Sequence, residues 1–277
     1  MTAADTPGPV VGRAQRDEPV EPYVTKVPHA LRRREIAVDA VSRPTPSVVR
    51  LRFTGEDLHD LESVGPMDHV KLVFDDAAAP GDAHPPRRDY TLRAVGPGWI
   101  EVDVVQHGDP VQGVAGAWAS RAAVGDRIAM LGPKSSKVVR QDLDWYVLAV
   151  DDTGLPMAAR WLAQAPTGAR VTLLAEIQSE DDVQELATRA EVTTRWLLRG
   201  EAAPGTTSLL AETLKAELSD GAHAADRGFV VVAGEALSLR SVKAHLRDVV
   251  GMPHGSFVLT GYWRRGVPDH DHHAEID

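Results

Sequence analysis

The chain has 277 residues, of which 43% are hydrophobic and 25% charged, a composition typical of a globular protein with about two domains. Its net charge of −10 argues against binding to nucleic acid or to an anionic membrane surface. Because cysteine is absent, disulfides, cysteine-ligated iron–sulfur clusters and thiol nucleophiles are excluded. Apolar runs fall short of the roughly 18 residues of a membrane span, and no secretory signal pattern opens the chain. We therefore expect a cytoplasmic protein.

The first half of the chain has the pattern of an antiparallel β-barrel. Residues 1–27 are rich in proline, alanine, glycine and charge, and we expect a mostly disordered tail there. From residue 28 to 138 apolar residues recur with period two, as where Val49, Leu51 and Phe53 alternate with arginines. Pro- and Gly-containing turns separate these runs, which favours short strands in a barrel or sandwich, with one short helix around Glu56–Leu61.

The second half, residues 139–277, changes rhythm to strands that alternate with helices. We expect strands at 145–150, 171–177, 193–198, 229–233 and 256–262. We expect helices at 155–164, 180–190, 207–218 and 237–250. Strands and helices that alternate through short links predict a Rossmann-like parallel sheet with helices on both faces. Such a sheet binds nucleotides at the carboxyl ends of its strands.

The segment Arg88-Asp89-Tyr90-Thr91 lies in the middle of the barrel pattern. An arginine can form paired hydrogen bonds with a pyrophosphate, an aromatic ring can lie against an isoalloxazine, and a hydroxyl can reach the flavin N5. Alternation along a strand would place Arg88 and Tyr90 on one face and Asp89 and Thr91 on the other. The segment thus indicates a flavin site, although four residues alone are a weak signal.

Two later segments of the first half allow a structural as well as a functional interpretation. His107-Gly108 follows a strand that carries Asp103 and Val105, and could either lie along a flavin or form a hydrogen-bonded turn. Gly113–Ala119 could begin a helix whose free N–H groups face a phosphate. The same segment could equally be a helix start with Trp118 in the core.

Three turns of the second half lie where strands end. Asp151–Pro156 and Ala233–Ala236 join strands to helices, without the Gly-x-Gly-x-x-Gly pattern of a dinucleotide fingerprint. Gly261–Gly266 carries two aromatic and two cationic residues, which could cover a flavin and attract an anion. The C-terminal histidines 270, 272 and 273 lie in a polar tail that we expect to be solvated, with no metal site.

These motifs, in this order, resemble the siderophore-interacting protein family over about residues 30–268. The family comprises FAD-dependent ferric-siderophore reductases of the ferredoxin-reductase-like superfamily. The resemblance implies an FAD-binding barrel at 28–138 and an NAD(P)H-binding domain at 139–277. It also implies a function: electrons pass from NAD(P)H through FAD to a ferric siderophore, which then releases Fe(II). No side chain is expected to act as a catalytic acid, base or nucleophile.

The resemblance implies roles for individual residues. Those implied to hold or line FAD are Arg88, Asp89, Tyr90, Thr91, Asp103, Val105, His107, Gly108, Gly116, Ala117, Trp118 and Trp263. Those implied to bind the nicotinamide nucleotide are Asp152, Thr153 and Arg199, the last within a Trp196-x-x-Arg199 segment that favours NADPH through its 2′-phosphate. Lys71 and Arg264 are implied to attract the ferric siderophore.

The chain departs from the family pattern at the first nucleotide turn. It has Val150 where the family usually has glycine, Asp152 for glutamate and Gly154 for alanine. These departures bear on the affinity for nicotinamide, so two alternatives stay open: a flavin reductase for another acceptor, or a siderophore-binding or regulatory flavoprotein without efficient turnover. Reduced ferredoxin is an alternative electron donor, and we expect a monomer.

Overall fold

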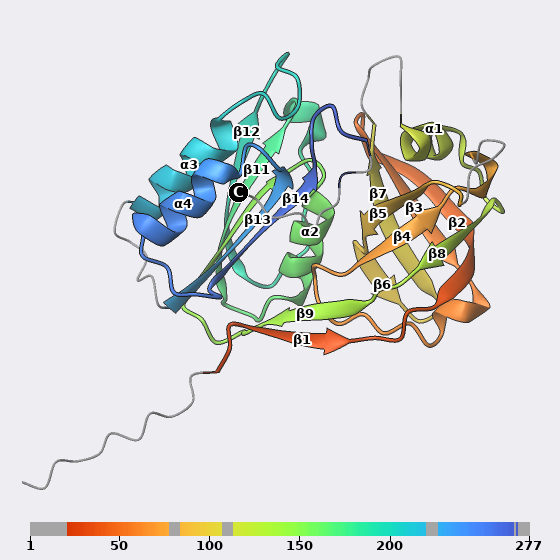
Figure 1. Ribbon diagram of the computed structural model, residues 1–277, viewed down its shortest axis with the longest axis horizontal. Coiled ribbons are helices and arrows are strands. Elements are labelled where there is room, and N and C mark those ends of the chain that lie inside the picture. The colour runs from red at the N-terminus through yellow and green to blue at the C-terminus, as the bar shows by residue number, and fades with distance from the viewer. Residues whose placement is uncertain (1–20, 78–83, 107–112, 220–226, 269, 271–277) are drawn as a thin grey trace, which may run out of the picture.

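Two β-sheets, one in each half of the chain, organise the protein (Figure 1). The structure is a computed structural model that describes residues 21–77, 84–106, 113–219, 227–268 and 270. A seven-stranded antiparallel sheet forms the first half and a five-stranded parallel sheet the second. The predicted barrel followed by a Rossmann-like sheet is therefore confirmed.

The antiparallel sheet curls around one apolar core, with strand order β5-β4-β8-β2-β3-β7-β6. Along β3 the apolar residues Val49, Leu51 and Phe53 are fully buried, because successive side chains of a strand point to opposite faces. The strands are β2 (Arg33–Thr45), β3 (Val48–Thr54), β4 (His69–Val73), β5 (Arg87–Thr91), β6 (Ala94–Gly96), β7 (Trp99–Val105) and β8 (Arg127–Leu131). The short helix expected after β3 is a 3-10 turn, Glu56–Leu58.

A single α-helix, α1 (Val114–Arg121), packs onto this core. Its Trp118 stacks on Phe53 with ring centroids 6.4 Å apart and meets Phe74 edge-on at 6.1 Å. Helical spacing places Ala115, Trp118 and Ala119 on the same buried face. The opposite interpretation of this segment, with Trp118 against a cofactor phosphate, is therefore wrong for that residue.

The N-terminal strand β1 (Val24–Pro28) pairs antiparallel with β9 (Ser135–Val139). This ribbon runs along the bottom of Figure 1, beneath both sheets. Tyr23, just before it, stacks on Phe229 of the parallel sheet, whereas His29, just after it, hydrogen-bonds Ser136 at 2.7 Å. Residues 24–27, which the composition assigned to a disordered tail, thus form a strand, because tertiary pairing outweighs local composition.

The parallel sheet has the order β12-β11-β10-β13-β14. Its strands are β10 (Trp145–Asp151), β11 (Arg170–Ile177), β12 (Glu191–Leu198), β13 (Gly228–Glu235) and β14 (Phe257–Trp263). Helix α2 (Leu155–Gln164) covers the face toward the barrel, while α3 (Leu209–Ser219) and α4 (Arg240–Asp248) cover the other (Figure 1). The chain reverses direction between β10 and β13, so the crevice typical of nucleotide binding lies at their carboxyl ends.

The helix expected at 180–190 does not form beyond a 3-10 turn, Glu180–Asp182. The segment instead reaches the barrel: the Ser47 hydroxyl donates to Asp182 at 2.5 Å, and the Arg50 guanidinium donates to Gln184 at 3.3 Å. Asp182 is buried by these contacts. Helix propensity is a weak preference, and contacts between the domains override it here.

Arg160 of α2 joins the two domains on the other side of the interface. Its guanidinium donates hydrogen bonds to the carbonyl oxygens of Ser63 at 2.9 Å and Leu92 at 3.1 Å, both in the barrel half. Only 4% of the residue is exposed. Since Leu92 directly follows Thr91, this contact positions the end of β5 against the parallel sheet.

We expect Arg160→Met to lower the free energy of unfolding by about 3 kcal/mol, because each of two hydrogen bonds from a charged donor contributes about 1.5 kcal/mol or more. The matched control is Arg170→Met, which removes an exposed arginine that donates one hydrogen bond to a backbone carbonyl. The control should lose less than about 1 kcal/mol. Urea unfolding followed by tryptophan fluorescence measures both, and equal losses would contradict a special role for Arg160.

Candidate functional site

The largest cavity of the described chain lies between the two domains and has a volume of about 720 Å³. Strand β5, the end of β7 and the start of α1 line it from the barrel, and β13, β14 and the start of α2 line it from the parallel sheet. Most of the residues predicted from sequence meet here. They are Arg88, Asp89, Tyr90, Thr91, Asp103, Val105, Gly116, Thr153 and Trp263.

Both faces of β5 reach this cavity. Strand β5 is the outermost strand of its sheet, with β4 on one side only. The cavity wraps around that edge, so Arg88 and Tyr90 line it together with Asp89 and Thr91. An edge strand therefore gives all four residues access to one ligand, although their side chains alternate.

Asp103 anchors two arginines at the cavity wall. Its side chain is 2% exposed and accepts paired hydrogen bonds from Arg50 at 2.7 and 2.9 Å. The Nε atom of Arg93 lies 3.1 Å from the same carboxylate. Two cations around one carboxylate leave this wall with an excess of positive charge, so Asp103 positions cations for an anionic ligand.

The amino end of α1 also faces the cavity. Gly113 is the N-cap residue and supplies no side-chain hydrogen bond to the free N–H groups of the first turn. Val114, Ala115 and Gly116 line the cavity, whereas Ala117 and Trp118 do not. The expectation that all of Gly116–Trp118 close a phosphate site is thus met by Gly116 alone, because the helix turns the later residues toward the barrel core.

Aromatic residues from both domains meet beside Thr91. Burial raises the pKa of Tyr90, and burial raises the pKa of Tyr262 to about 12. The Tyr262 side chain forms a hydrogen bond with Thr91 across the interface. Its neighbour Trp263 donates from Nε1 to Asp151 at 2.8 Å. Both tyrosines are therefore neutral around physiological pH and offer ring faces and hydroxyls.

These residues fit FAD. The cavity volume lies in the range of small-molecule sites, about 300–1,000 Å³. One end offers the Arg88 guanidinium and the uncapped helix start, which suit a pyrophosphate. The other offers Tyr90, Thr91 and Tyr262, which suit an aromatic ring with polar edges.

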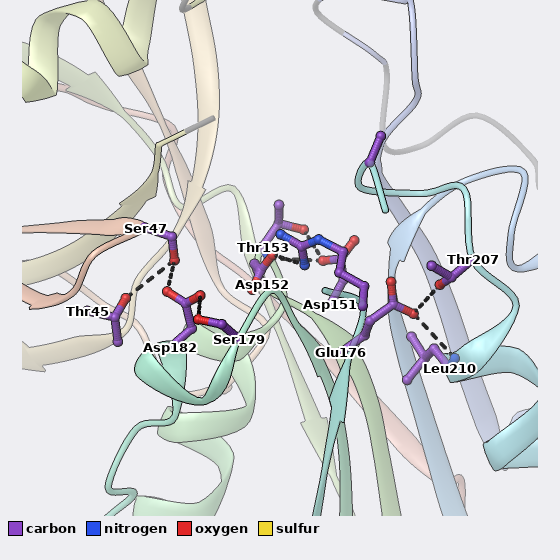
Figure 2. Close-up of polar contacts among 12 residues, drawn as sticks. Thr45, Ser47, Asp151, Asp152, Thr153, Glu176, Ser179, Asp182, Thr207 and Leu210 are labelled. Carbon is purple, nitrogen blue, oxygen red and sulfur yellow. Dashed lines mark hydrogen bonds and ion pairs between the residues drawn. The ribbon is translucent and has the colours of Figure 1, made fainter. Parts of the chain in front are cut away.

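A second, smaller cavity of about 30 Å³ lies at the carboxyl ends of β10, β11 and β13. Asp152 and Arg199 form an ion pair there at 2.5 Å, with side chains only 8% and 5% exposed. Glu176 accepts from the Thr207 hydroxyl at 2.8 Å, and Asp151 lies close by (Figure 2). Burial raises the pKa of Asp152 to about 7, and burial also raises the pKa of Asp151.

Asp152 and Arg199 thus lie outside the large cavity, whereas Thr153 and Trp263 line both cavities. Arg199 is engaged with a carboxylate and has Glu176 and Glu235 in the same cavity. Trp196, three residues earlier, packs against the core beneath α2. The first nucleotide turn therefore touches the large cavity only through Thr153.

Val150 and Gly154 fit each other sterically. A Cβ atom added at Gly154 would lie 2.8 Å from the Cβ of Val150, closer than real side chains approach. A valine at 150 therefore requires glycine at 154. The two departures from the family pattern are one compensated exchange, which leaves the backbone of this turn intact.

Other predicted residues lie elsewhere. Neither Lys71 nor Arg264 lines the large cavity: the Lys71 ammonium lies 2.6 Å from Asp89 Oδ2, and Arg264 is exposed beside Val267. Both assignments to the siderophore therefore lack support from the cavity geometry. His107 and Gly108 lie outside the described residues.

Several cavity residues were missed by sequence reasoning. They are Lys26, Met67, His69, Ser135, Lys137 and Lys243, from four separate segments. No motif marks them, and Lys26 lies in the stretch taken for a tail. Within the described ranges no cluster of three or more histidine or acidic side chains could hold a metal ion, and no helix is long and apolar enough to cross a membrane.

Comparison with known proteins supports this geometry. Residues 75–137 match the siderophore-interacting FAD-binding domain and residues 143–266 match the siderophore-interacting protein family. The ferric vibriobactin reductase ViuB of Vibrio cholerae is 25% identical over 83% of this chain and 88% of its own length. The NADPH-dependent ferric-chelate reductase of Escherichia coli is 28% identical over 77% of this chain and 86% of its own.

A solved structure gives the same result for the whole chain. The crystal structure of a siderophore utilization protein from T. fusca superposes with a TM-score of 0.81 at 34% identity. It covers 91% of this chain and 100% of its own. With an FAD-binding domain matched on the barrel and a second match across the parallel sheet, the chain belongs to the siderophore-interacting protein family.

Proposed function

We propose that this protein binds FAD and passes electrons from a nicotinamide nucleotide to a ferric siderophore, which then releases Fe(II). One observation carries the proposal: Arg88, Tyr90, Thr91 and the uncapped start of α1 line one cavity together with the carboxyl-end turn of the parallel sheet. The reductase names of the relatives from V. cholerae and E. coli support the same reaction.

The residues of the cavity would divide the work by position. Arg88 and the α1 N–H groups would bind the pyrophosphate, Tyr90 would pack against the ring, and the Thr91 hydroxyl would reach its polar edge. Bound FAD would supply the conversion of a two-electron donor into single-electron transfers. The protein would exclude water and hold donor and acceptor, and no side chain would need to move a proton.

The donor would enter at the carboxyl ends of β10 and β13, where Thr153 and Trp263 line both cavities. NADPH is the donor that the sequence favours through Arg199, and the name of the E. coli relative agrees with it. Arg199 would have to exchange the Asp152 carboxylate for the 2′-phosphate. Ferredoxin as donor, a monomeric state and a cytoplasmic location stay predictions from sequence.

The alternatives are a flavin reductase for another acceptor and a siderophore-binding flavoprotein without turnover. The second drew on the altered turn at Val150 and Gly154, and the steric match of these residues weakens that argument. Bleaching of the flavin by NADPH, NADH or reduced ferredoxin, followed by reoxidation with a ferric siderophore, distinguishes all three. A protein that stays colourless after reconstitution with FAD would rule out the proposal.

Arg88→Ala should lower the affinity for FAD by about 1.5–3 kcal/mol, the contribution of a hydrogen bond to a charged group. The matched control is Arg87→Ala, since Arg87 lies on the same strand but does not line the cavity. Quenching of FAD fluorescence on titration into apoprotein measures both affinities. If Arg87→Ala weakened FAD as much as Arg88→Ala, the pyrophosphate assignment would be wrong.

The preference for NADPH should depend on pH. Between about pH 8 and about pH 6.5, protonation of Asp152, whose pKa is raised to about 7, neutralises the carboxylate that holds Arg199. The ratio of second-order rate constants for flavin reduction by NADPH and NADH should therefore rise as the pH falls. Stopped-flow absorbance measures this ratio.

The rise should vanish in Arg199→Ala and persist in Arg195→Ala, which removes an exposed arginine on the same strand. Asp152→Asn, which cannot become negative, should show a ratio that no longer changes with pH. Equal rates for both nucleotides at every pH, unchanged in Arg199→Ala, would refute the assignment of the 2′-phosphate to Arg199.

A further inference from the structure

Two lysines face each other across the ribbon that forms the floor of the large cavity. Lys26 of β1 and Lys137 of β9 are direct partners in the antiparallel register. Directly opposite residues of such a pair project from the same face, and both side chains line the cavity. Like charges in this position destabilise a ribbon, so the pair calls for a counter-charge.

The chain does not supply that counter-charge. In the described part of the protein, neither lysine forms an ion pair or a side-chain hydrogen bond. Burial and the charge of Lys26 lower the pKa of Lys137. Lys243 of α4 and His69 of β4 line the same cavity and add further cationic groups. In a protein of net charge −10, this is a local site for an anion.

The lysines lie at the end of the cavity away from the proposed pyrophosphate site. In the pairing of β5 with β4, Arg88 is opposite Leu72 and Thr91 is opposite His69, about 10 Å further along the strand. Lys137 belongs to the His69 end: Ser136 beside it donates to Asp68 at 2.5 Å, and the Lys137 carbonyl abuts Gly65. The lysine pair is therefore beyond Thr91, on the side where a ring would end and an acceptor could enter.

We propose that Lys26 and Lys137 form an anion-binding subsite for the electron acceptor, which selects ferric chelates of net negative charge. This inference rests on the proposed function, because it places the acceptor beside the bound flavin. A ferric complex of three catecholates carries three negative charges, since three doubly charged ligands surround a trivalent ion. Three singly charged hydroxamates leave the complex neutral. The lysine pair would therefore favour the catecholate complex.

A second source of negative charge is the flavin itself, once it has been reduced. The experiment must therefore separate binding of the chelate from an effect on the flavin. Gallium(III) forms the same oxygen-ligated complexes as iron(III) but does not accept an electron. Its tris-catecholate and tris-hydroxamate complexes thus measure binding to the oxidised holoprotein, by the change in flavin absorption or fluorescence, without any turnover.

The variants are Lys26→Gln, Lys137→Gln and the double variant, with Lys134→Gln as matched control. Lys134 is an exposed lysine three residues before Lys137 that does not line the cavity. Each single variant should weaken binding of the gallium tris-catecholate by about fivefold, the factor for about 1 kcal/mol from a partly solvated charge pair. The double variant should lose more, and the salt dependence of its binding should shrink.

Binding of the neutral tris-hydroxamate should be unchanged in all variants, and Lys134→Gln should match the unmodified protein. Equal affinity of the double variant and the unmodified protein for the gallium tris-catecholate would overturn the proposal. So would a shift in the flavin midpoint potential of the double variant without a change in chelate affinity, because the pair would then act on the flavin. If the variants weaken the chelate as expected but no ferric chelate reoxidises the reduced protein, the subsite stands and the proposed reductase function falls.

Discussion

The hydrogen bonds from Arg160 to the barrel are the interaction on which the site most depends. The residues of the large cavity come from two separate sheets, so their distances are set by how the sheets dock. Arg160 ties the carbonyl oxygen of Leu92 to α2, directly beside Thr91. On the far side, the contact of Ser47 with Asp182 holds the same two domains (Figure 2). A cofactor site built between domains is only as rigid as these contacts.

The position of β5 at the edge of its sheet is a second constraint. A strand inside a sheet is flanked on both sides and reaches ligands from one face at a time. At the edge, the backbone of β5 turns one side to the cavity, and four consecutive side chains become available. The burial of Tyr90 and Tyr262 on either side of Thr91 then makes this end of the cavity apolar, while Arg88 keeps the other end cationic.

The sequence predicted the architecture and the flavin segment because both leave local patterns. Period-two alternation marked β3 and β7, and Arg88–Thr91 carried its own chemistry in four consecutive residues. What failed depended on contacts between distant segments. Trp118 was placed near a phosphate, but Phe53 and Phe74 hold it in the core. The helix at 180–190 yielded to contacts with the barrel, and Lys26 lay in a segment whose composition alone resembles a tail.

The pairing of β1 with β9 also governs the order in which the protein can be completed. Strand β1 is synthesised before any other described element, but its partner follows the whole barrel, and Tyr23 packs on Phe229 later still. Contacts so distant along the chain form late, because the closure of a long loop costs entropy before the contact is gained. The floor of the cavity therefore closes only after both domains exist. A nascent or partly folded chain can gather a barrel core, but it has no enclosed site in which to reduce iron.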